Sequence, residues 1–378
     1  MVTNNYLDLD IQKAFANNVP GCIEHHQKLQ SAIADAKTRH RSLTLCWLDL
    51  ANAYGSVPHN LIHFSLRHYH APPQFSATVM NLYSNLSAMI SSKHWNTSFI
   101  PFKVGVFQGD PLSVSIFNTV INTLVDVITS QPQLGYTIST INHPLSLLQY
   151  ADDSCLVADG PASSQKQLNL VDRWLHWSGL KAKVSKCCSL AIRASSSKPF
   201  NPNLSLNQQP IPYLHHEPTK FLGLSVSFSP NHQHYKSELL DKLSSLMTKV
   251  DRSLVSRSQK IMLYSRAICP RLSWLLLIHP FSPTWLTTQA DPIATRFLKK
   301  WCGLCKSADP NRFYLPRQYG GMGLPAISTS HKAIQVSKAS QLMSSSDKCV
   351  QDLAYKKPKK NLSLKDALSS LIPWPNRS

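Results

Sequence analysis

Acidic residues are scarce in this sequence. Its 378 residues include 20 Asp+Glu against 39 Lys+Arg, which gives a formal net charge of +19 and a pI of about 9.6. Such an excess of basic residues favours a polyanionic partner, with nucleic acid first and an anionic membrane surface second. Because 43% of the residues are hydrophobic, the chain is not a disordered tail. Its length allows roughly two or three structural units.

Regularly spaced cysteines and long apolar runs are also missing. The nine cysteines are an odd number without a regular spacing, so we expect reduced thiols rather than a disulfide framework. Cys302 and Cys305 have the spacing of zinc ligands, but no second Cys/His pair accompanies them. The densest apolar run, residues 272–281, is far shorter than the ~20 residues of a membrane span, and no signal-peptide pattern opens the chain. These absences favour a soluble, intracellular protein.

The two halves of the chain differ in their hydrophobic patterns. Helical spacing predicts helices over residues 20–37, 60–70, 73–87, 111–128 and 165–180 of the first half. Strand-like stretches separate them at residues 42–54, 98–106, 144–159 and 221–228. From about residue 237 onward, helix follows helix. We therefore predict an α+β domain joined to an α-helical one.

The stretch "PLSLLQYADDSCLVAD", residues 144–159, contains two adjacent carboxylates between two apolar flanks. A short polar break between such flanks predicts a β-hairpin, with Asp152 and Asp153 at or beside its turn. An aspartate often starts a turn by bonding its own backbone, and this structural explanation is sufficient for an isolated pair.

A third carboxylate, Asp49, lies in the apolar stretch "SLTLCWLDLANAY", which predicts a strand. Burying a carboxylate there costs several kcal/mol unless a cation or hydrogen-bond donors face it. An Arg or Lys partner is the structural alternative. However, three carboxylates from adjacent strands would form the oxygen-rich site that Mg²⁺ uses with phosphates, and in an acid-poor chain this favours nucleic-acid phosphoryl transfer.

Five ordered motifs resemble the palm motifs of reverse transcriptases, most closely those of LINE-type non-LTR retrotransposons. They are "WLDLANAYGSVPH", "VFQGDPLSVSIFN", "LLQYADDSCLVAD", "GLKAKVSKC" and "KFLGLSVSF". The resemblance spans about residues 11–345. It implies a right-hand polymerase with a remnant of the fingers (1–42), a palm with inserted fingers helices (43–228), a helical thumb (229–300) and a C-terminal connection with a basic tail (301–378).

The resemblance also implies a metal site and a nucleotide site. Asp49 and Asp152 would hold two Mg²⁺ ions, or Mn²⁺ as an alternative, with the backbone carbonyl of Leu50, and Asp153 would complete the acidic cluster. Other residues correspond to family positions around the nucleotide and the primer end: Tyr54, which would exclude a ribose 2′-hydroxyl; Gln108 and Gly109, which would lie against nucleotide and template; Tyr150, beneath the primer end; and Lys186, which would protonate the leaving pyrophosphate. Half-buried packing for Tyr54 and plain solvation for Lys186 are the structural alternatives.

Phe221, Leu222 and Gly223 correspond to the segment that grips the primer, and a buried edge strand is their structural alternative. The family's partners would be an RNA template, a DNA primer or target, dNTPs and the RNA–DNA hybrid, with no membrane. The basic run at residues 356–360 would be a nuclear-import signal, a phosphate-contacting patch or a mobile tail.

Departures from the family pattern leave two hypotheses open. The fingers strands that usually precede "IQKAF" and an endonuclease domain are missing, so we expect an N-terminally truncated piece of a retrotransposon polyprotein, with those parts supplied by the rest of the element. The chain is then an RNA-templated DNA polymerase in the nucleus and/or cytoplasm. The alternative is a catalytically inactive remnant that binds nucleic acid.

Overall fold

The computed structural model describes residues 6–16, 19–139, 141, 144–196, 198–214, 218–227 and 232–355. These residues form two compact units. Among the described residues, unit 1 contains residues 6–227 together with Ser345–Leu353, and unit 2 contains residues 232–344 and 354–355. The basic run at residues 356–360 lies outside the described residues. The division into fingers, palm and thumb stays a prediction.

Unit 1 is built on an antiparallel five-stranded sheet with the strand order β6-β7-β1-β8-β9. The strands are β1 (Leu43–Leu48), β6 (Leu147–Tyr150), β7 (Asp153–Ala158), β8 (Cys188–Ile192) and β9 (Pro199–Phe200). The central strand β1 is buried along its whole length. A strand covered on both faces favours a near-continuous apolar sequence, and in LTLCWL only Thr44 is polar.

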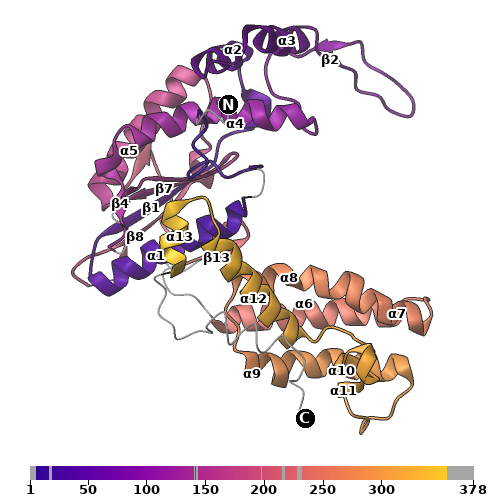
Figure 1. The fold of residues 1–378 in the computed structure, drawn as a ribbon. Helices are drawn as coiled ribbons and strands as arrows, with labels where there is room; N and C mark the ends of the chain where they lie inside the picture. The colour runs from indigo at the N-terminus through magenta and orange to yellow at the C-terminus, as the bar shows by residue number, and fades with distance from the viewer. Residues whose placement is uncertain are drawn as a thin grey trace. The chain divides into compact units, whose positions relative to one another are not determined.

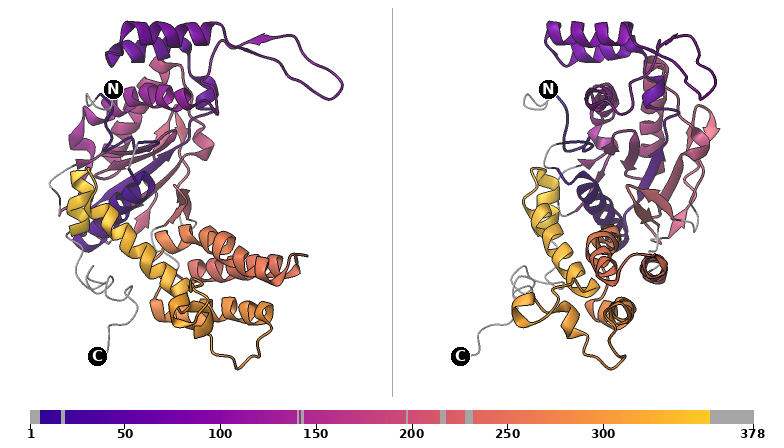
Figure 2. Two further views of the ribbon diagram at one scale, coloured as in Figure 1. Left: turned by 45° about the vertical axis from the view of Figure 1, so that its right-hand side comes forward. Right: turned by 90° about the vertical axis from the view of Figure 1, so that its right-hand side faces the viewer.

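Helices cover both faces of this sheet (Figure 1 and Figure 2). On one face, α4 (Pro111–Thr129) and α5 (Pro161–Ser178) share a core cluster with Cys46 and Leu48 of β1. On the other face lies α1 (Gly21–Arg39). Asp110 caps α4, accepting a hydrogen bond from Leu112 N, and Gly179 ends α5 in the left-handed conformation.

Smaller elements complete unit 1. Helices α2 (His59–His68) and α3 (Pro73–Ser84) pack against each other, and α2 contacts α4. The remaining strands form short two-stranded pairs: β2 (Ser87–Ala88) with β3 (Ile100–Pro101), β4 (Tyr136–Thr137) with β5 (Pro144–Leu145), β10 (Ser205–Leu206) with β11 (Gln209–Pro210), and β12 (Thr219–Phe221) with β13 (Leu224–Val226). Helix α13 (Lys348–Tyr355) belongs to this unit through its residues up to Leu353.

The regular elements of unit 2 are all helices among its described residues, and loops connect them. Its helices are α6 (His232–Arg252), α7 (Arg257–Leu263), α8 (Cys269–Ile278), α9 (Pro283–Trp285), α10 (Asp291–Cys302), α11 (Asn311–Tyr314) and α12 (Ile327–Met343). Leu239, Leu243 and Met247 form the buried stripe of α6, while Lys242 and Lys249 are exposed. The predicted α+β part followed by a helical part is therefore confirmed at the level of secondary structure.

Several predicted boundaries were wrong. The strand β1 ends at Leu48, so Asp49 follows the strand instead of lying inside it. The predicted helix 73–87 ends at Ser84, and within 98–106 only Ile100–Pro101 forms a strand. The predicted strand at 221–228 is a hairpin, because the chain turns back at Leu222 and Gly223.

Two helical stretches, Pro111–Thr129 and Arg257–Ile278, are long and apolar enough to cross a membrane by length and composition. We expected no apolar run close to the length of a membrane span. That expectation is wrong when the mean hydropathy of a whole helix is used as the measure. The indication of a membrane span is nevertheless weak, because the core helices of soluble domains have the same composition. Most residues of Pro111–Thr129 are buried inside unit 1.

Candidate active site

The predicted hairpin with the paired aspartates is confirmed. Strands β6 and β7 pair from Leu147↔Leu156 to Tyr150↔Asp153, which leaves Ala151 and Asp152 as the turn. Asp152 and Asp153 are exposed, whereas Ala151 is buried and has a φ of 52°. A left-handed conformation is uncommon for a residue with a Cβ and costs about 1 kcal/mol. The turn therefore presents two carboxylates from a strained backbone.

Asp49 lies beside this turn. Strand β1 pairs with β7 up to Leu48↔Ser154, and one further residue along both strands brings Asp49 next to Asp153. Burial and the charges of Asp152 and Asp49 raise the pKa of Asp153. Among the described residues, no Lys, Arg or His forms an ion pair with any of these three carboxylates. The predicted Arg or Lys partner of Asp49 is thus not seen among the described residues.

The segment at residues 180–187 runs alongside Asp49. Lys183 N donates to Asp49 O (2.8 Å), and Ala51 N donates to Lys181 O (2.8 Å). These hydrogen bonds flank Leu50, which forms an antiparallel bridge with Ala182. They also explain why β1 ends early: beyond Leu48 the backbone pairs with this segment. Lys186 follows in a short 3₁₀ turn, where its side chain is exposed.

Tyr54 lies near the acidic turn and is held by a ring contact. Its ring stacks on Phe117 of α4, with centroids 4.1 Å apart and an interplanar angle of 13°. Burial, followed by the charge of Asp152, raises the pKa of the Tyr54 hydroxyl. Val106 N donates to Tyr54 O (2.7 Å). The half-buried packing weighed as the structural alternative is therefore present, together with proximity to Asp152.

The loop before α4 leaves Gln108 and Gly109 exposed. Gly109 has a φ of 96°, and no heavy atom lies within 4 Å of where a Cβ would be. Glycine adopts this positive φ without strain, and the surface above its backbone is open. Asp110 fixes the end of the loop by accepting hydrogen bonds from Leu112 N (3.3 Å) and Ser113 Oγ (3.2 Å).

The predicted primer-grip residues form the turn between β12 and β13. Phe221 is buried, and both central residues of the turn have positive φ, 50° at Leu222 and 77° at Gly223. Two positive φ values describe a type I′ hairpin, in which leucine is unusual. His26 Nε2 is 3.2 Å from Phe221 O, so this hairpin contacts α1.

Helix α1 also contacts the acidic hairpin, through a histidine that the sequence analysis missed. His25 is fully buried and its Nε2 donates to Gln149 O (2.9 Å). Burial lowers the pKa of His25 well below its usual value, and nearby Lys28 acts in the same direction. Tyr150, one residue further, is half-buried and lies with its ring centroid 6.4 Å from that of Phe15. Neighbouring histidines of α1 thus support the acidic hairpin and the β12–β13 hairpin.

The chemistry of the acidic cluster fits a hard divalent cation. Its donors are carboxylate oxygens without a protein cation, which is the donor type that Mg²⁺ and Mn²⁺ prefer. Within the described part of the chain, no three His, Cys, Asp or Glu side chains are grouped so that they could hold one metal ion. Mg²⁺ at phosphoryl-transfer sites uses one or two carboxylates and takes its other ligands from substrate phosphates and water. A metal ion at this cluster would therefore need ligands besides the side chains of the described residues.

The cysteine pair with zinc-ligand spacing lies at the end of α10. Cys302 is half-buried and Cys305 is exposed. Hydrogen bonding to Ser307 lowers the pKa of the Cys305 thiol.

Comparison with known proteins identifies the family. Residues 2–226 match the reverse transcriptase (RNA-dependent DNA polymerase) family. The match covers more than half of the chain, so the chain belongs to this family and carries a reverse transcriptase domain homologous to RNA-directed DNA polymerases.

The curated relatives of the chain come from retrotransposable elements. The chain is similar to Pol polyproteins of type-1 retrotransposable element R2 from Nasonia vitripennis (24% identical over 317 residues, 81% of this chain and 30% of the relative) and Popillia japonica (25% over 347 residues, 88% and 47%). A Drosophila melanogaster relative from type-2 element R2DM is 22% identical over 313 residues (81% and 29%). These are non-LTR, LINE-like elements, as the motifs predicted. The chain spans less than half of the length of these relatives.

Among solved structures, telomerase from Candida tropicalis in complex with a fragment of telomeric RNA resembles the chain with a TM-score of 0.42 and 11% identity, over 88% of this chain and 52% of that one. At this score the likeness is weak, and the family assignment rests on the sequence match.

Proposed function

We propose that this reverse transcriptase domain extends a DNA primer on an RNA template, adding dNTPs to the primer 3′-hydroxyl by two-metal phosphoryl transfer. The observation that carries the proposal is the acidic cluster of Asp49, Asp152 and Asp153. Carboxylates that lie together and have no ion-pair partner among the described residues are electrostatically unfavourable on their own, and a chain with a net charge of +19 could readily supply such a partner. The presence of the cluster supports a site that is completed by metal ions.

Asp49, Asp152 and the carbonyl of Leu50 would hold two Mg²⁺ ions, or Mn²⁺, with Asp153 completing the acidic cluster. When bound, such ions lower the pKa of the primer hydroxyl and stabilise charge on the leaving pyrophosphate. The protein's own task is to hold these carboxylates in place. Three features support this: the pairing of β1 with β7, the hydrogen bonds of the 180–187 segment around Leu50, and the rigid turn at Ala151.

The other site residues would position substrates. Tyr54, stacked on Phe117, would block a ribose 2′-hydroxyl, and the open backbone at Gly109 with Gln108 would lie against nucleotide and template. Tyr150 would lie beneath the primer end. The exposed Lys186 would protonate pyrophosphate, since a mobile ammonium near a departing phosphate is a suitable general acid.

The remaining assignments concern larger parts of the chain. Unit 1 would be the palm with part of the fingers, and Phe221, Leu222 and Gly223 would grip the primer. The helices of unit 2 would act as the thumb, contacting the phosphates of an RNA–DNA hybrid through exposed lysines such as Lys242 and Lys249, without sequence preference. An endonuclease and further fingers would come from the rest of the element, which would act on DNA in the nucleus.

Primer extension tests the proposal. The purified chain would be given an RNA template annealed to a DNA primer, dNTPs and Mg²⁺, beside an Asp152→Asn, Asp153→Asn double variant. Asp159→Asn is the matched control, because Asp159 is an exposed carboxylate at the far end of the same hairpin, 3.8 Å from Arg41. We expect extension by the unaltered chain and by the control, and a loss of about a thousandfold or more in the double variant. Hybrid binding without extension by the unaltered chain would instead establish a binding remnant.

A further inference from the structure

Both backbone groups of Ala151 are bonded to buried side-chain amides. Ala151 N donates to Gln12 Oε1 (3.0 Å). Ala151 O accepts from Gln149 Nε2 (2.6 Å) and, at the longer distance of 3.4 Å, from Gln12 Nε2. The two glutamines are 1% and 0% exposed. Ala151 is the strained residue directly before Asp152, so its backbone sets the direction in which that carboxylate leaves the turn.

Gln12 reaches the turn from a short stretch between two turns, where it forms an isolated parallel bridge with Gln149 at the edge of the sheet. Residues 11–13 lie parallel to β6, with Lys13 N donating to Gln149 O (3.1 Å) and Gln149 N donating to Ile11 O (3.1 Å). Gln12 Oε1 also accepts from Ala14 N (3.1 Å). The Gln12 amide is therefore also hydrogen-bonded to the backbone of its own segment, which preorganises it as a partner for Ala151.

Gln149 is fixed in a similar way. Its Oε1 accepts from Ser154 Oγ (2.7 Å), across the hairpin, and His25 donates to its carbonyl. The two amides together satisfy every polar group of Ala151, and a left-handed alanine persists only where its surroundings determine it in this manner.

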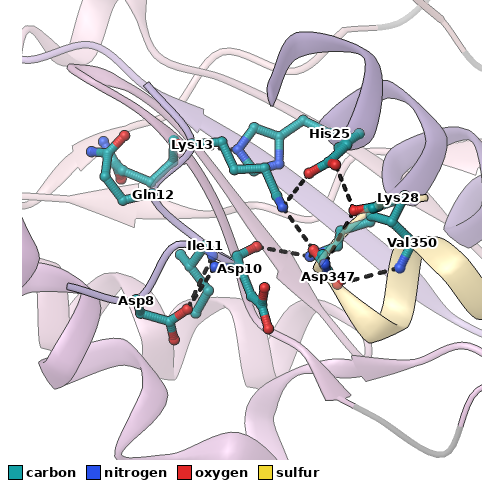
Figure 3. A network of polar contacts seen from close by, with 12 residues as sticks. Asp8, Asp10, Ile11, Gln12, Lys13, His25, Lys28, Asp347 and Val350 are labelled. Carbon is teal, nitrogen blue, oxygen red and sulfur yellow. Dashed lines mark hydrogen bonds and ion pairs between the residues drawn. The ribbon is translucent and has the colours of Figure 1, made fainter. Parts of the chain in front are cut away.

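The segment is anchored on its other side by buried charges. Figure 3 shows the side chain of Lys13 directed away from Gln12, toward Asp347. Lys13 Nζ forms ion pairs with Glu24 of α1 and with Asp347 before α13, the latter at 2.8 Å. An extended chain directs alternate side chains to opposite sides. The buried lysine thus prevents residue 12 from withdrawing from the turn.

We propose that Gln12 is a positioning residue that holds the Ala151 backbone and thereby places the Asp152 carboxylate for metal and nucleotide binding. The inference rests on the proposed polymerase function. The competing interpretation is that the Gln12 amide is a hydrogen-bonded core group that only stabilises the packing of residues 8–14 against the rest of unit 1.

A second buried glutamine provides the matched control. Gln167 of α5 is 0% exposed, and its Nε2 donates to Ser146 O (3.4 Å) and Val157 O (3.3 Å). It bonds to the backbone around the same hairpin, but at the end away from the turn. Gln12→Met and Gln167→Met each remove a buried amide of the same size, and only the first removes the acceptor of Ala151 N.

The test combines amide hydrogen exchange with nucleotide-addition kinetics on the full chain. In Gln12→Met we expect the Ala151 amide to exchange at least about tenfold faster and the maximal rate of addition to fall at least about tenfold, while the KM for the RNA–DNA primer-template changes less than about twofold. Gln167→Met should leave both the Ala151 exchange and the maximal rate within about twofold of the unaltered chain. Gln12→Glu keeps an acceptor for Ala151 N, so its exchange rate at Ala151 and its maximal rate should lie between those of Gln12→Met and the unaltered chain. This variant provides the comparison if Gln12→Met does not fold.

Equal effects of the two methionine variants, or a Gln12→Met chain with unchanged exchange at Ala151, would overturn the proposal. The proposed function can fail separately: an unaltered chain that adds no nucleotide refutes the polymerase, whereas the exchange comparison, which needs neither metal nor substrate, still decides whether Gln12 holds the turn.

Discussion

Replacing Asp347 by asparagine should release α13 from unit 1. Asp347 Oδ2 lies 2.8 Å from Lys13 Nζ and 2.5 Å from Lys28 Nζ, by proximity rather than as an aligned hydrogen bond. Glu24 is the other acid of this cluster, and all four side chains are at most 4% exposed. Burial opposes ionisation, but the charges of Lys28 and Lys13 outweigh it and hold the pKa of Asp347 below its usual value. Asparagine would leave two lysines facing one carboxylate.

The size of the effect follows from these distances. At an effective dielectric constant of ~20, each of the two pairs attracts by roughly 6 kcal/mol before desolvation. Burying the carboxylate costs several kcal/mol, so breaking the arrangement from one side should destabilise it by about 3 to 5 kcal/mol. The helix cap should survive, because asparagine can still accept the hydrogen bond that Asp347 Oδ1 receives from Val350 N (3.3 Å).

Hydrogen exchange of the α13 amides measures this change locally. We expect their protection to fall at least about a hundredfold in Asp347→Asn, which corresponds to about 3 kcal/mol. Asp352→Asn is the matched control in the same helix, since Asp352 forms an exposed pair with Lys348 (3.4 Å). Such a pair contributes about 0.3 to 0.5 kcal/mol, or roughly a twofold change in protection. Similar losses in the two variants would refute the role of the buried charges.

Three further predictions follow from single residues. Burial depresses the pKa of His25, so the folded state is favoured by the neutral form above pH 6.5 and this stabilisation is lost as the pH falls. The free energy of unfolding, measured at a series of pH values, should therefore change by up to about 1.4 kcal/mol per pH unit. This slope should be smaller in His25→Gln. Tyr54→Val should lower discrimination against ribonucleotides at least about tenfold in single-nucleotide addition, whereas Tyr54→Phe, which keeps the ring on Phe117, should not. Gly223→Ala, at a φ of 77°, should destabilise the β12–β13 hairpin by about 1 kcal/mol in denaturant unfolding, and an unchanged midpoint would contradict the turn geometry.

The acidic hairpin and the main helices could be predicted because their signals are local. The apolar flanks around Asp152 define two strands and a turn, the helical period of α4 is unbroken, and Gly179 marks the end of α5. The end of β1 could not be predicted in this way. Residues 43–50 form a nearly continuous apolar run, and the strand stops at Leu48 because the backbone then pairs with residues 181–183, far along the chain.

The supporting residues of the site were missed for a related reason. Gln12 and Ala151 are separated by 139 residues, and a single glutamine in an extended segment gives no periodic signal. The attachment of residues Ser345–Leu353 to unit 1 depends on the ion pairs of Asp347, which no local pattern of the sequence indicates. The β12–β13 turn was mistaken for a continuous strand because leucine is rarely found where φ is positive.

The proposed function requires metal ions to bind at Asp49 and Asp152, beside Asp153, and iron-directed cleavage of the polypeptide is the most direct test of such binding. Fe²⁺ would replace Mg²⁺ on the full chain with bound RNA–DNA hybrid and dNTP, and ascorbate and peroxide would generate radicals at the bound ion. We expect cuts near Asp49 and near Asp152 that excess Mg²⁺ suppresses. These cuts should be absent in the Asp152→Asn, Asp153→Asn variant but present in Asp159→Asn. Cleavage elsewhere, or cleavage that the double variant retains, would contradict the proposed binding.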